Sequence, residues 1–153
     1  MNNPHQALVD WLKTIDNSNL LDIAYLLSSS PYFSVISDQH LEQDEIIEKF
    51  WEIVDSYSES SFKSAAFLVS FKALFDFYFE SRLSEEGWKE VEDRHERMLK
   101  LPELTPSMEA HLNRMISLLP DRKKAWIGFS DRWNSLKNNE LSSQSLLQWT
   151  QNK

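Results

Sequence analysis

The chain has 153 residues, a formal net charge of −8, no cysteine and only two glycines, Gly87 and Gly128. Average glycine usage of about 7% would give roughly 11. This scarcity excludes glycine-rich phosphate-binding loops and leaves few tight hairpins, because both need the backbone freedom of glycine. The lack of cysteine excludes disulfides, thiolate catalysis and cysteine-based zinc sites. A hydrophobic content of 41% is too high for a disordered chain.

The N-terminal part of the chain predicts two short helices and a connection. Apolar residues recur at helical spacing over 7–15, which predicts the first helix. The polar run 16–19 can cap a second helix over 20–27. A serine run followed by proline stops that helix, because the residue before proline disfavours the α region. We therefore expect residues 28–40 to form an irregular connection.

A third helix is predicted from about Leu41 to Tyr57, and its two faces separate at about 100° per residue. Its apolar face consists of Ile46, Ile47, Phe50, Ile53, Val54 and Tyr57. Its opposite face carries the carboxylates of Glu42, Glu45, Glu48, Glu52, Asp55 and the distal Glu59. Residues 38–59 hold eight carboxylates and one lysine, so the predicted helix has a strongly acidic outer face.

Residues 61–81 are apolar on nearly every side, which predicts a helix in the centre of a bundle, touched on several sides. The remaining helices are predicted at 85–100, 106–119, 121–136 and about 142–149. Ser84 and Thr105 are suitable N-caps, and Pro120 is expected to end one helix before the next begins. The fold class that follows is an all-α bundle of seven to eight helices around the helix at about 61–81, in one globular domain over residues 1–153.

The six tryptophans divide into two groups by their helical positions. Helical periodicity places four of them on core faces, namely Trp11, Trp88, Trp126 and Trp133. Trp51 lies at the edge of an apolar face and Trp149 lies near the end of the chain. These last two are therefore the candidate anchors for a binding partner, because buried aromatic side chains dominate many protein interfaces.

The acidic face of the third helix is the main candidate site. Like charges at spacings of three and four residues repel by a few tenths of a kcal/mol per pair, and a positive partner would relieve that repulsion. The candidate partner-binding residues are Glu42, Glu45, Glu48, Trp51, Glu52, Asp55 and Glu59. The alternative is a solvated face that only aids solubility.

These features favour a noncatalytic protein-binding protein, namely a small acidic inhibitor or immunity-type protein that neutralises a basic protein partner. Residues 1–80 hold 13 acidic and 4 basic side chains, a balance of −9, which attracts cations and repels nucleic acids and anionic membranes. The predicted helix at 121–136 carries basic and aromatic residues, and we interpret its aromatic side as a face that packs into the bundle core. No signal peptide or membrane span is recognised, and we expect a cytoplasmic protein without cofactors. The alternative is a secretion chaperone or adaptor that binds through an apolar groove.

Two histidines on neighbouring predicted helices are a second candidate site. His95 and His111 fall on apolar faces at matching levels of an expected antiparallel hairpin, and Glu92 precedes the first by one turn. Two histidines and one carboxylate are a plausible transition-metal set. The alternative is a pair of core histidines satisfied by hydrogen bonds, which the absence of a second Glu-x-x-His pair favours.

The third class of function that the sequence could support is an enzyme. All-α nucleotide pyrophosphohydrolases hold Mg²⁺ with Glu-x-x-Glu and Glu-x-x-Asp pairs on neighbouring helices, and this chain has Glu45-x-x-Glu48 and Glu90-x-x-Asp93. A whole predicted helix separates the two pairs, and such spacings arise easily among 24 carboxylates. Nucleophilic catalysis has no motif here. We expect His5 in a flexible end of the chain and His40 just before the start of a helix. No catalytic residue is therefore assigned.

Overall fold

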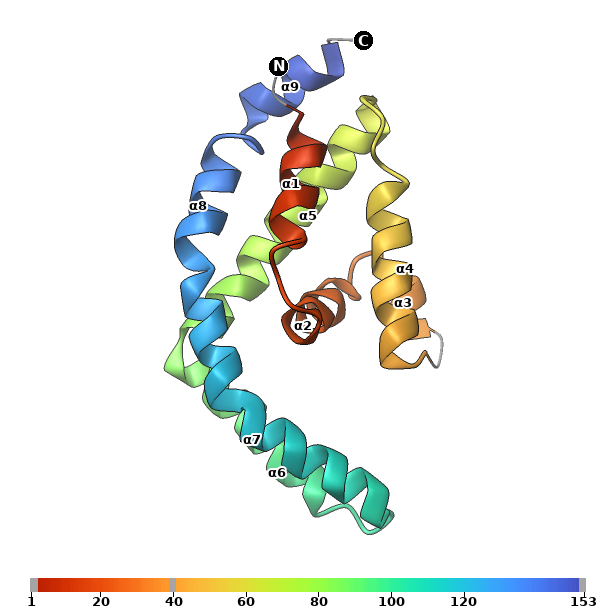
Figure 1. Ribbon diagram of the computed structural model, residues 1–153, viewed down its shortest axis with the longest axis vertical. Helices are drawn as coiled ribbons and strands as arrows, with labels where there is room; N and C mark the ends of the chain where they lie inside the picture. Colours follow the sequence, from red (N-terminus) through yellow and green to blue (C-terminus); the bar gives the residue numbers. More distant parts are fainter. Residues whose placement is uncertain (1–2, 39–40, 152–153) are drawn as a thin grey trace. The chain divides into compact units, whose positions relative to one another are not determined.

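The computed structural model describes residues 3–38 and 41–151, and within these residues every regular element is a helix (Figure 1). The helices are α1 (Pro4–Leu12), α2 (Asn17–Leu27), α3 (Ser34–Asp38), α4 (Gln43–Asp55), α5 (Phe62–Leu83), α6 (Glu85–Leu99), α7 (Pro106–Gly128), α8 (Ser130–Asn138) and α9 (Ser143–Gln151). The expected all-α helical bundle is therefore confirmed, with α5 close to the helix expected at about 61–81.

The chain divides into two compact units, one formed by Met1–Asp76 with Asp131–Lys153 and the other by Phe77–Ser130. In the first unit α1 packs against α9, and α2 packs against α3 and α4. In the second unit α6 and α7 lie side by side (Figure 1). The expectation of one globular domain over residues 1–153 stays a prediction.

Aromatic side chains on α5 form the core of the first unit. Phe67, Phe71 and Phe75 follow one another along one face of the helix and are all buried. The ring of Phe75 lies 4.6 Å from that of Trp133 on α8 and 5.5 Å from that of Trp11 on α1. Burying aromatic rings of this size contributes several kcal/mol to folding, so α5 fixes the positions of its neighbours.

Trp11 of α1, Trp126 of α7 and Trp133 of α8 all contact α5, as expected for a central helix, but one side of α5 is exposed. Phe62 is 86% exposed, Val69 is 54% exposed and Phe77 is 72% exposed. All-round hydrophobicity predicted burial on every face, because apolar side chains normally avoid water. The surrounding helices cover only the face that carries Phe67, Phe71 and Phe75, and a second apolar face remains uncovered.

The N-terminal segment is anchored, which corrects the expectation of a flexible end around His5. The side chain of Asn3 caps α1 by accepting a hydrogen bond from the backbone N–H of Gln6 at 3.1 Å. His5 is only 4% exposed, and its Nε2 donates to the carbonyl of Val54 at the end of α4, at 2.7 Å. A buried imidazole bonded to a distant backbone group ties α1 to α4. His40 lies outside the described residues.

The connection expected to be irregular over residues 28–40 contains a turn and the short helix α3 in its described part. Phe33 is 1% exposed, and its ring stacks on that of Phe50 with centroids 5.6 Å apart. Ile36 is also buried. These two apolar side chains hold the segment against α4, so tertiary packing stabilises a helix too short to persist alone.

Gly87 lies in the first turn of α6, where the chain has just left α5. The hydroxyl of Ser84 caps this helix by accepting from the N–H of Gly87 at 3.0 Å. A Cβ atom at Gly87 would overlap the backbone carbonyl of Ser81, so only glycine fits at this approach. A Cβ at Gly128, by contrast, would meet no other atom.

Pro120 does not end a helix as expected, because α7 continues through it from Pro106 to Gly128. Proline lacks the N–H that would bond to the carbonyl of Ile116, and this loss normally kinks or breaks a helix. Leu119 and Trp126, on either side of the proline, are buried, and the ring of Trp126 lies 5.4 Å from that of Phe79. Packing of both halves of α7 therefore offsets the missing hydrogen bond.

The helix expected over 121–136 is instead divided at Phe129, which forms the C-cap of α7 before α8 begins. Gly128 precedes this break, and glycine is a poor helix former. Trp126, Trp133 and Leu136, which recur at helical spacing as an apolar stripe over residues 121–136, are all buried. The prediction that this stripe belongs to the core is confirmed for these three, although the stripe spans two helices.

Candidate functional site

The apolar and acidic faces of α4 separate as the sequence predicts. Ile46, Phe50 and Val54 are buried and fix the orientation of the helix. At its start, the backbone N–H of Glu42 donates to the side chain of Glu45 at 3.3 Å. Acidic side chains in the first turn also interact favourably with the positive end of the helix dipole. The local sequence therefore both starts α4 and turns its carboxylates outward.

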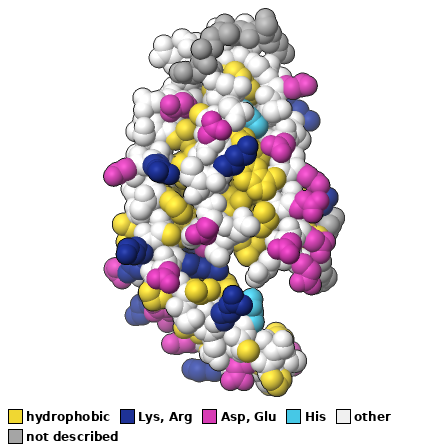
Figure 2. All heavy atoms as spheres, viewed as in Figure 1, with side chains coloured by type: hydrophobic (Ala, Val, Ile, Leu, Met, Phe, Trp, Pro, Cys, Tyr) yellow, Lys and Arg dark blue, Asp and Glu magenta, His cyan; other side chains and the backbone are white. Residues whose placement is uncertain are grey.

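The carboxylates on the outer face of α4 form one exposed surface, which we call the acidic surface. It consists of Glu42, Glu45, Glu48, Glu52, Asp55 and Glu59, all of them exposed. Figure 2 shows acidic side chains gathered on the side of the molecule where α4 lies in Figure 1. Lys49 lies 3.2 Å from Glu52, but both side chains are substantially exposed, so this ion pair contributes little. The surface therefore keeps a strong negative potential.

Asp55 and Glu59 place negative charge where it does not stabilise the helix. Asp55 is the last residue of α4, whose final turn contains no basic residue. The C-terminal end of a helix carries a partial negative charge, so a carboxylate there is unfavourable by a few tenths of a kcal/mol. Helix stability therefore explains the acidic residues at the start of α4 but not those at its end.

The two candidate anchor tryptophans have different environments. Trp51 is half-buried, and its ring lies 5.7 Å from that of Phe50 at the border of the acidic surface. Trp149 is only 7% exposed, and its backbone carbonyl accepts a hydrogen bond from the hydroxyl of Ser60. The expectation that Trp149 is an exposed anchor is therefore wrong, because α9 turns this ring into the core. The four tryptophans expected in the core are all buried.

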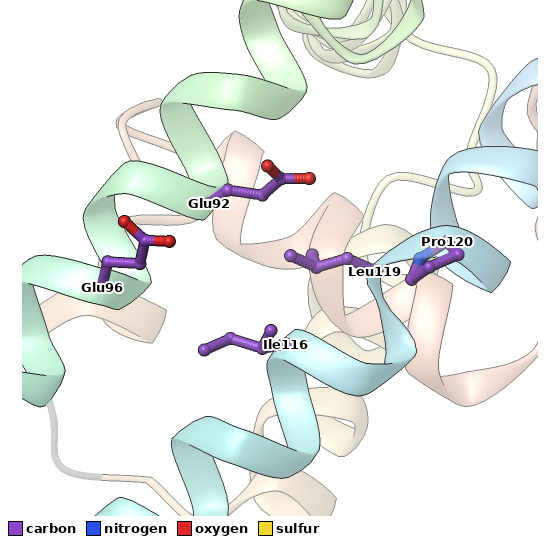
Figure 3. A pocket seen from close by; sticks show the side chains of 5 residues that line it. All are labelled: Glu92, Glu96, Ile116, Leu119 and Pro120. Atoms are coloured by element: carbon purple, nitrogen blue, oxygen red, sulfur yellow. The ribbon is translucent and has the colours of Figure 1, made fainter.

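A hollow of about 170 Å³ between α6 and α7 combines acidic and apolar walls. Figure 3 shows Glu92 and Glu96 on α6 across from Ile116 and Leu119 on α7, with Pro120 at one end. The side chains of Glu92 and Leu119 point toward one another in this view (Figure 3). Such a hollow suits the aliphatic stem and charged head of a lysine or arginine side chain. The sequence suggests Glu92 as part of a metal set but gives no sign of this hollow.

His95, His111 and Glu92 do not form the candidate metal site. His95 is half-buried, and its Nδ1 donates to the carbonyl of Val91 on its own helix at 2.8 Å. His111 is exposed, which corrects its expected place on a core face, because α7 turns that side to solvent. Among residues 3–38 and 41–151, no three His, Asp or Glu side chains are grouped so that they could hold a metal ion.

The carboxylate pairs expected for a pyrophosphohydrolase lie on different helices of different units. Glu45 and Glu48 are exposed on α4, in the first unit, whereas Glu90 and Asp93 are exposed on α6, in the second. Arg94 lies 3.7 Å from Glu90 and forms a surface ion pair with it. The first pair belongs to the acidic surface, as its position opposite the buried face of α4 implies.

A polar network around Asp76 on α5 is a further feature that was not predicted from the sequence. The carboxylate accepts hydrogen bonds from the indole N–H of Trp133 at 2.8 Å and from the ammonium of Lys137 at 2.7 Å. Lys72, one turn earlier, donates to the carbonyl of Leu141 at 3.1 Å. Burial alone would raise the pKa of Asp76, but the two hydrogen bonds and the charges of Lys137 and Lys72 outweigh burial and lower this pKa.

This network joins α5 to α8 and to the segment before α9. Its sequence signal is a lysine and an aspartate four residues apart within an otherwise apolar run. Charged side chains in such a run need partners when the helix is packed, so they indicate a buried network. The network is structural, because its polar groups bond to one another and to the backbone.

Comparisons of the chain with protein-family models, with curated proteins and with solved structures gave no match. In the described part of the chain, none of the helices combines the length and the apolar character needed to cross a membrane. Any function must then be inferred from the surfaces of the chain itself, and the acidic surface is the main candidate among them.

Proposed function

We propose that this chain is a noncatalytic protein-binding protein, a small acidic inhibitor of the immunity type that acts in the cytoplasm. Its acidic surface on α4 would bind and neutralise a basic protein partner. The observation that carries the proposal is the exposure of all six carboxylates of this surface beside a single lysine. Asp55 at the C-terminal end of α4 strengthens it, because its charge opposes the helix dipole and is relieved by a cationic partner.

Binding would proceed in two steps. The negative potential of the acidic surface first raises the rate at which a basic partner arrives, by a factor of about 10–10³ at low salt. The half-buried ring of Trp51, at the border of the surface, would then be covered by the partner.

The test is a pull-down from lysate of the source cells at about 50 mM and 500 mM salt, with every retained protein identified. A charge-reversed variant, called the reversed variant below, carries Glu45→Lys, Glu48→Lys and Glu52→Lys. A matched control carries Asp93→Lys, Glu103→Lys and Glu109→Lys, which change the net charge equally at exposed positions outside α4. Circular dichroism of all three proteins shows whether each variant keeps its helices.

We expect one basic protein to be retained by the wild type and by the control at low salt. It should be lost at high salt, because the Debye length falls from about 10 Å at 0.1 M to about 3 Å at 1 M. It should also be lost from the folded reversed variant. Equal retention by wild type and reversed variant would contradict the proposal. Retention that salt does not weaken would favour an adaptor that binds through an apolar groove.

A further inference from the structure

The hollow between α6 and α7 lies wholly within the second unit and has two unlike walls. Glu92 and Glu96 supply the acidic wall, and Ile116, Leu119 and Pro120 supply the apolar wall (Figure 3). Small-ligand sites in proteins combine apolar surface with a few polar groups that fix the orientation of the ligand. This hollow has the same composition, at a volume of about 170 Å³.

The acidic wall carries negative charge that the chain itself does not neutralise. Glu92 and Glu96 stand one turn apart on α6, so their like charges repel one another. Lys89 lies one turn before this pair and Lys100 lies one turn after it. In the described part of the chain, neither glutamate forms a hydrogen bond or an ion pair with these lysines or with any other residue. A cation in the hollow would relieve the repulsion.

The apolar wall contains a backbone acceptor that has lost its usual donor. Pro120 has no N–H, so the carbonyl of Ile116 lacks the hydrogen bond that an uninterrupted helix would give it. Ile116 and Pro120 both line the hollow. Pro120 is exposed, so burial of its ring does not explain its place inside α7. The two helices therefore contribute acceptor groups together with apolar surface.

We propose that this hollow binds the ammonium group of a linear aliphatic amine. An ammonium head has three N–H donors and no acceptor, which suits a site that offers acceptors. The aliphatic chain would lie on Ile116, Leu119 and Pro120, as the stem of a lysine side chain covers apolar surface. At the about 30 Å³ that a water-sized group occupies, the hollow holds roughly five or six non-hydrogen atoms. Pentylamine has this size.

Other cations fit the hollow less well than an ammonium group. A guanidinium group is a planar fork that matches both oxygens of one carboxylate, whereas the hollow presents two separate carboxylates from successive turns. A metal ion would make no use of the apolar wall. Among residues 3–38 and 41–151 there is also no group of three His, Asp or Glu side chains that could hold one. A compact charge on an aliphatic chain uses both walls.

Pentylamine is the probe for this site, and the amide NMR signals of the protein report where it binds. At pH 7 and constant ionic strength, signals of residues 92–96 and 116–121 should shift and reach saturation. We expect a dissociation constant on the order of 1–10 mM, which is usual for a ligand of about six non-hydrogen atoms. Affinity should rise by about twofold for each methylene from ethylamine to pentylamine, because each one is partly buried. It should stop rising with longer amines, which exceed the hollow.

Neutralising the acidic wall separates recognition of charge from apolar contact. Glu92→Gln combined with Glu96→Gln should weaken pentylamine binding by about three- to tenfold, because two exposed charge interactions are lost. The matched control combines Glu103→Gln with Glu109→Gln, which removes the same charge at exposed positions that do not line the hollow. This control should leave the affinity unchanged. The amide spectrum of each variant also shows whether it is folded.

A second probe, Nα-acetyl-lysine methylamide, distinguishes two sources of the ammonium group. Tighter binding of this probe assigns the hollow to a lysine side chain of another protein, and tighter binding of pentylamine assigns it to a free amine. The proposal is overturned by the absence of a saturable shift at residues 92–96 and 116–121, by equal affinities of the two double variants, or by equal affinity for neutral 1-pentanol. Because no residue of α4 lines the hollow, this proposal and that for the acidic surface can fail independently.

Discussion

Replacing Asp76 with alanine removes the acceptor at the centre of the polar network on α5. The indole N–H of Trp133 and the ammonium of Lys137 both donate to this carboxylate. Trp133 is fully buried, so its N–H would lose its protein acceptor, and only water entering the space left by the Asp76 side chain, which is 34% exposed, could replace it. Lys137 is less affected, because its side chain is 19% exposed and can be partly rehydrated.

The cost of Asp76→Ala follows from these two losses. A buried donor that loses its acceptor costs about 1–3 kcal/mol, and the partly exposed ion pair adds at most about 1 kcal/mol after solvent screening. We expect the free energy of unfolding to fall by about 3 kcal/mol. For a chain of this length that loss lowers the melting temperature by about 6–12 °C.

The effect should depend on pH with a definite sign. The pKa of Asp76 is lowered in the folded protein, so its ionised form is bound more strongly there than in the unfolded chain. The stability that ionised Asp76 contributes is fully present above its pKa in the unfolded chain, about 4. This stability is lost as the pH falls through the lower pKa of Asp76 in the folded protein. The difference between wild type and Asp76→Ala should therefore stay constant between about pH 5 and 8 and narrow below about pH 4.

Urea denaturation at pH 7, 5, 4 and 3 measures this difference. The matched control is Glu80→Ala, which removes an exposed carboxylate one turn further along α5. We expect the control to change stability by less than about 0.5 kcal/mol. If the two variants unfold alike at pH 7, or if the difference grows toward acid, the reasoning about the network is wrong.

Four further substitutions test the fold, each by its effect on thermal or urea denaturation. Gly87→Ala should cost about 1–3 kcal/mol because its Cβ meets backbone, whereas Gly128→Ala should be neutral or stabilising by up to about 1 kcal/mol. Pro120→Ala should stabilise the protein by up to about 3 kcal/mol, since it restores a helical hydrogen bond at an exposed position. His5→Ala should cost about 2 kcal/mol, because it removes the buried bond to Val54 and the packing of the ring.

Most of the fold could be predicted from the sequence because the helices carry their own start signals. Asp16, Ser84 and Thr105 cap α2, α6 and α7 with their side chains, as the sequence suggested for Ser84 and Thr105. Such caps act within one turn, so they can be recognised without tertiary information. Helix ends set by packing could not be predicted. Pro120 is the example, because the burial of Trp126 beyond it depends on Phe79, 47 positions earlier in the chain.

The same distinction holds for the candidate site: features set by local sequence could be predicted, and features set by tertiary packing could not. The acidic surface was predictable, because a helical repeat alone separates Glu45 and Glu48 from the buried side of α4. The network of Asp76 was not, because Trp133 and Lys137 come from a helix more than fifty residues later. Burial of Trp149 was missed for the same reason. Periodicity identifies the faces of a helix, but only tertiary packing decides which apolar face is covered.

Salt tests the proposed contact on α4, because that contact depends on charge. Binding of a basic partner to the acidic surface is an attraction between unlike charges, so added salt weakens it. A titration from about 50 mM to 500 mM should therefore release the partner.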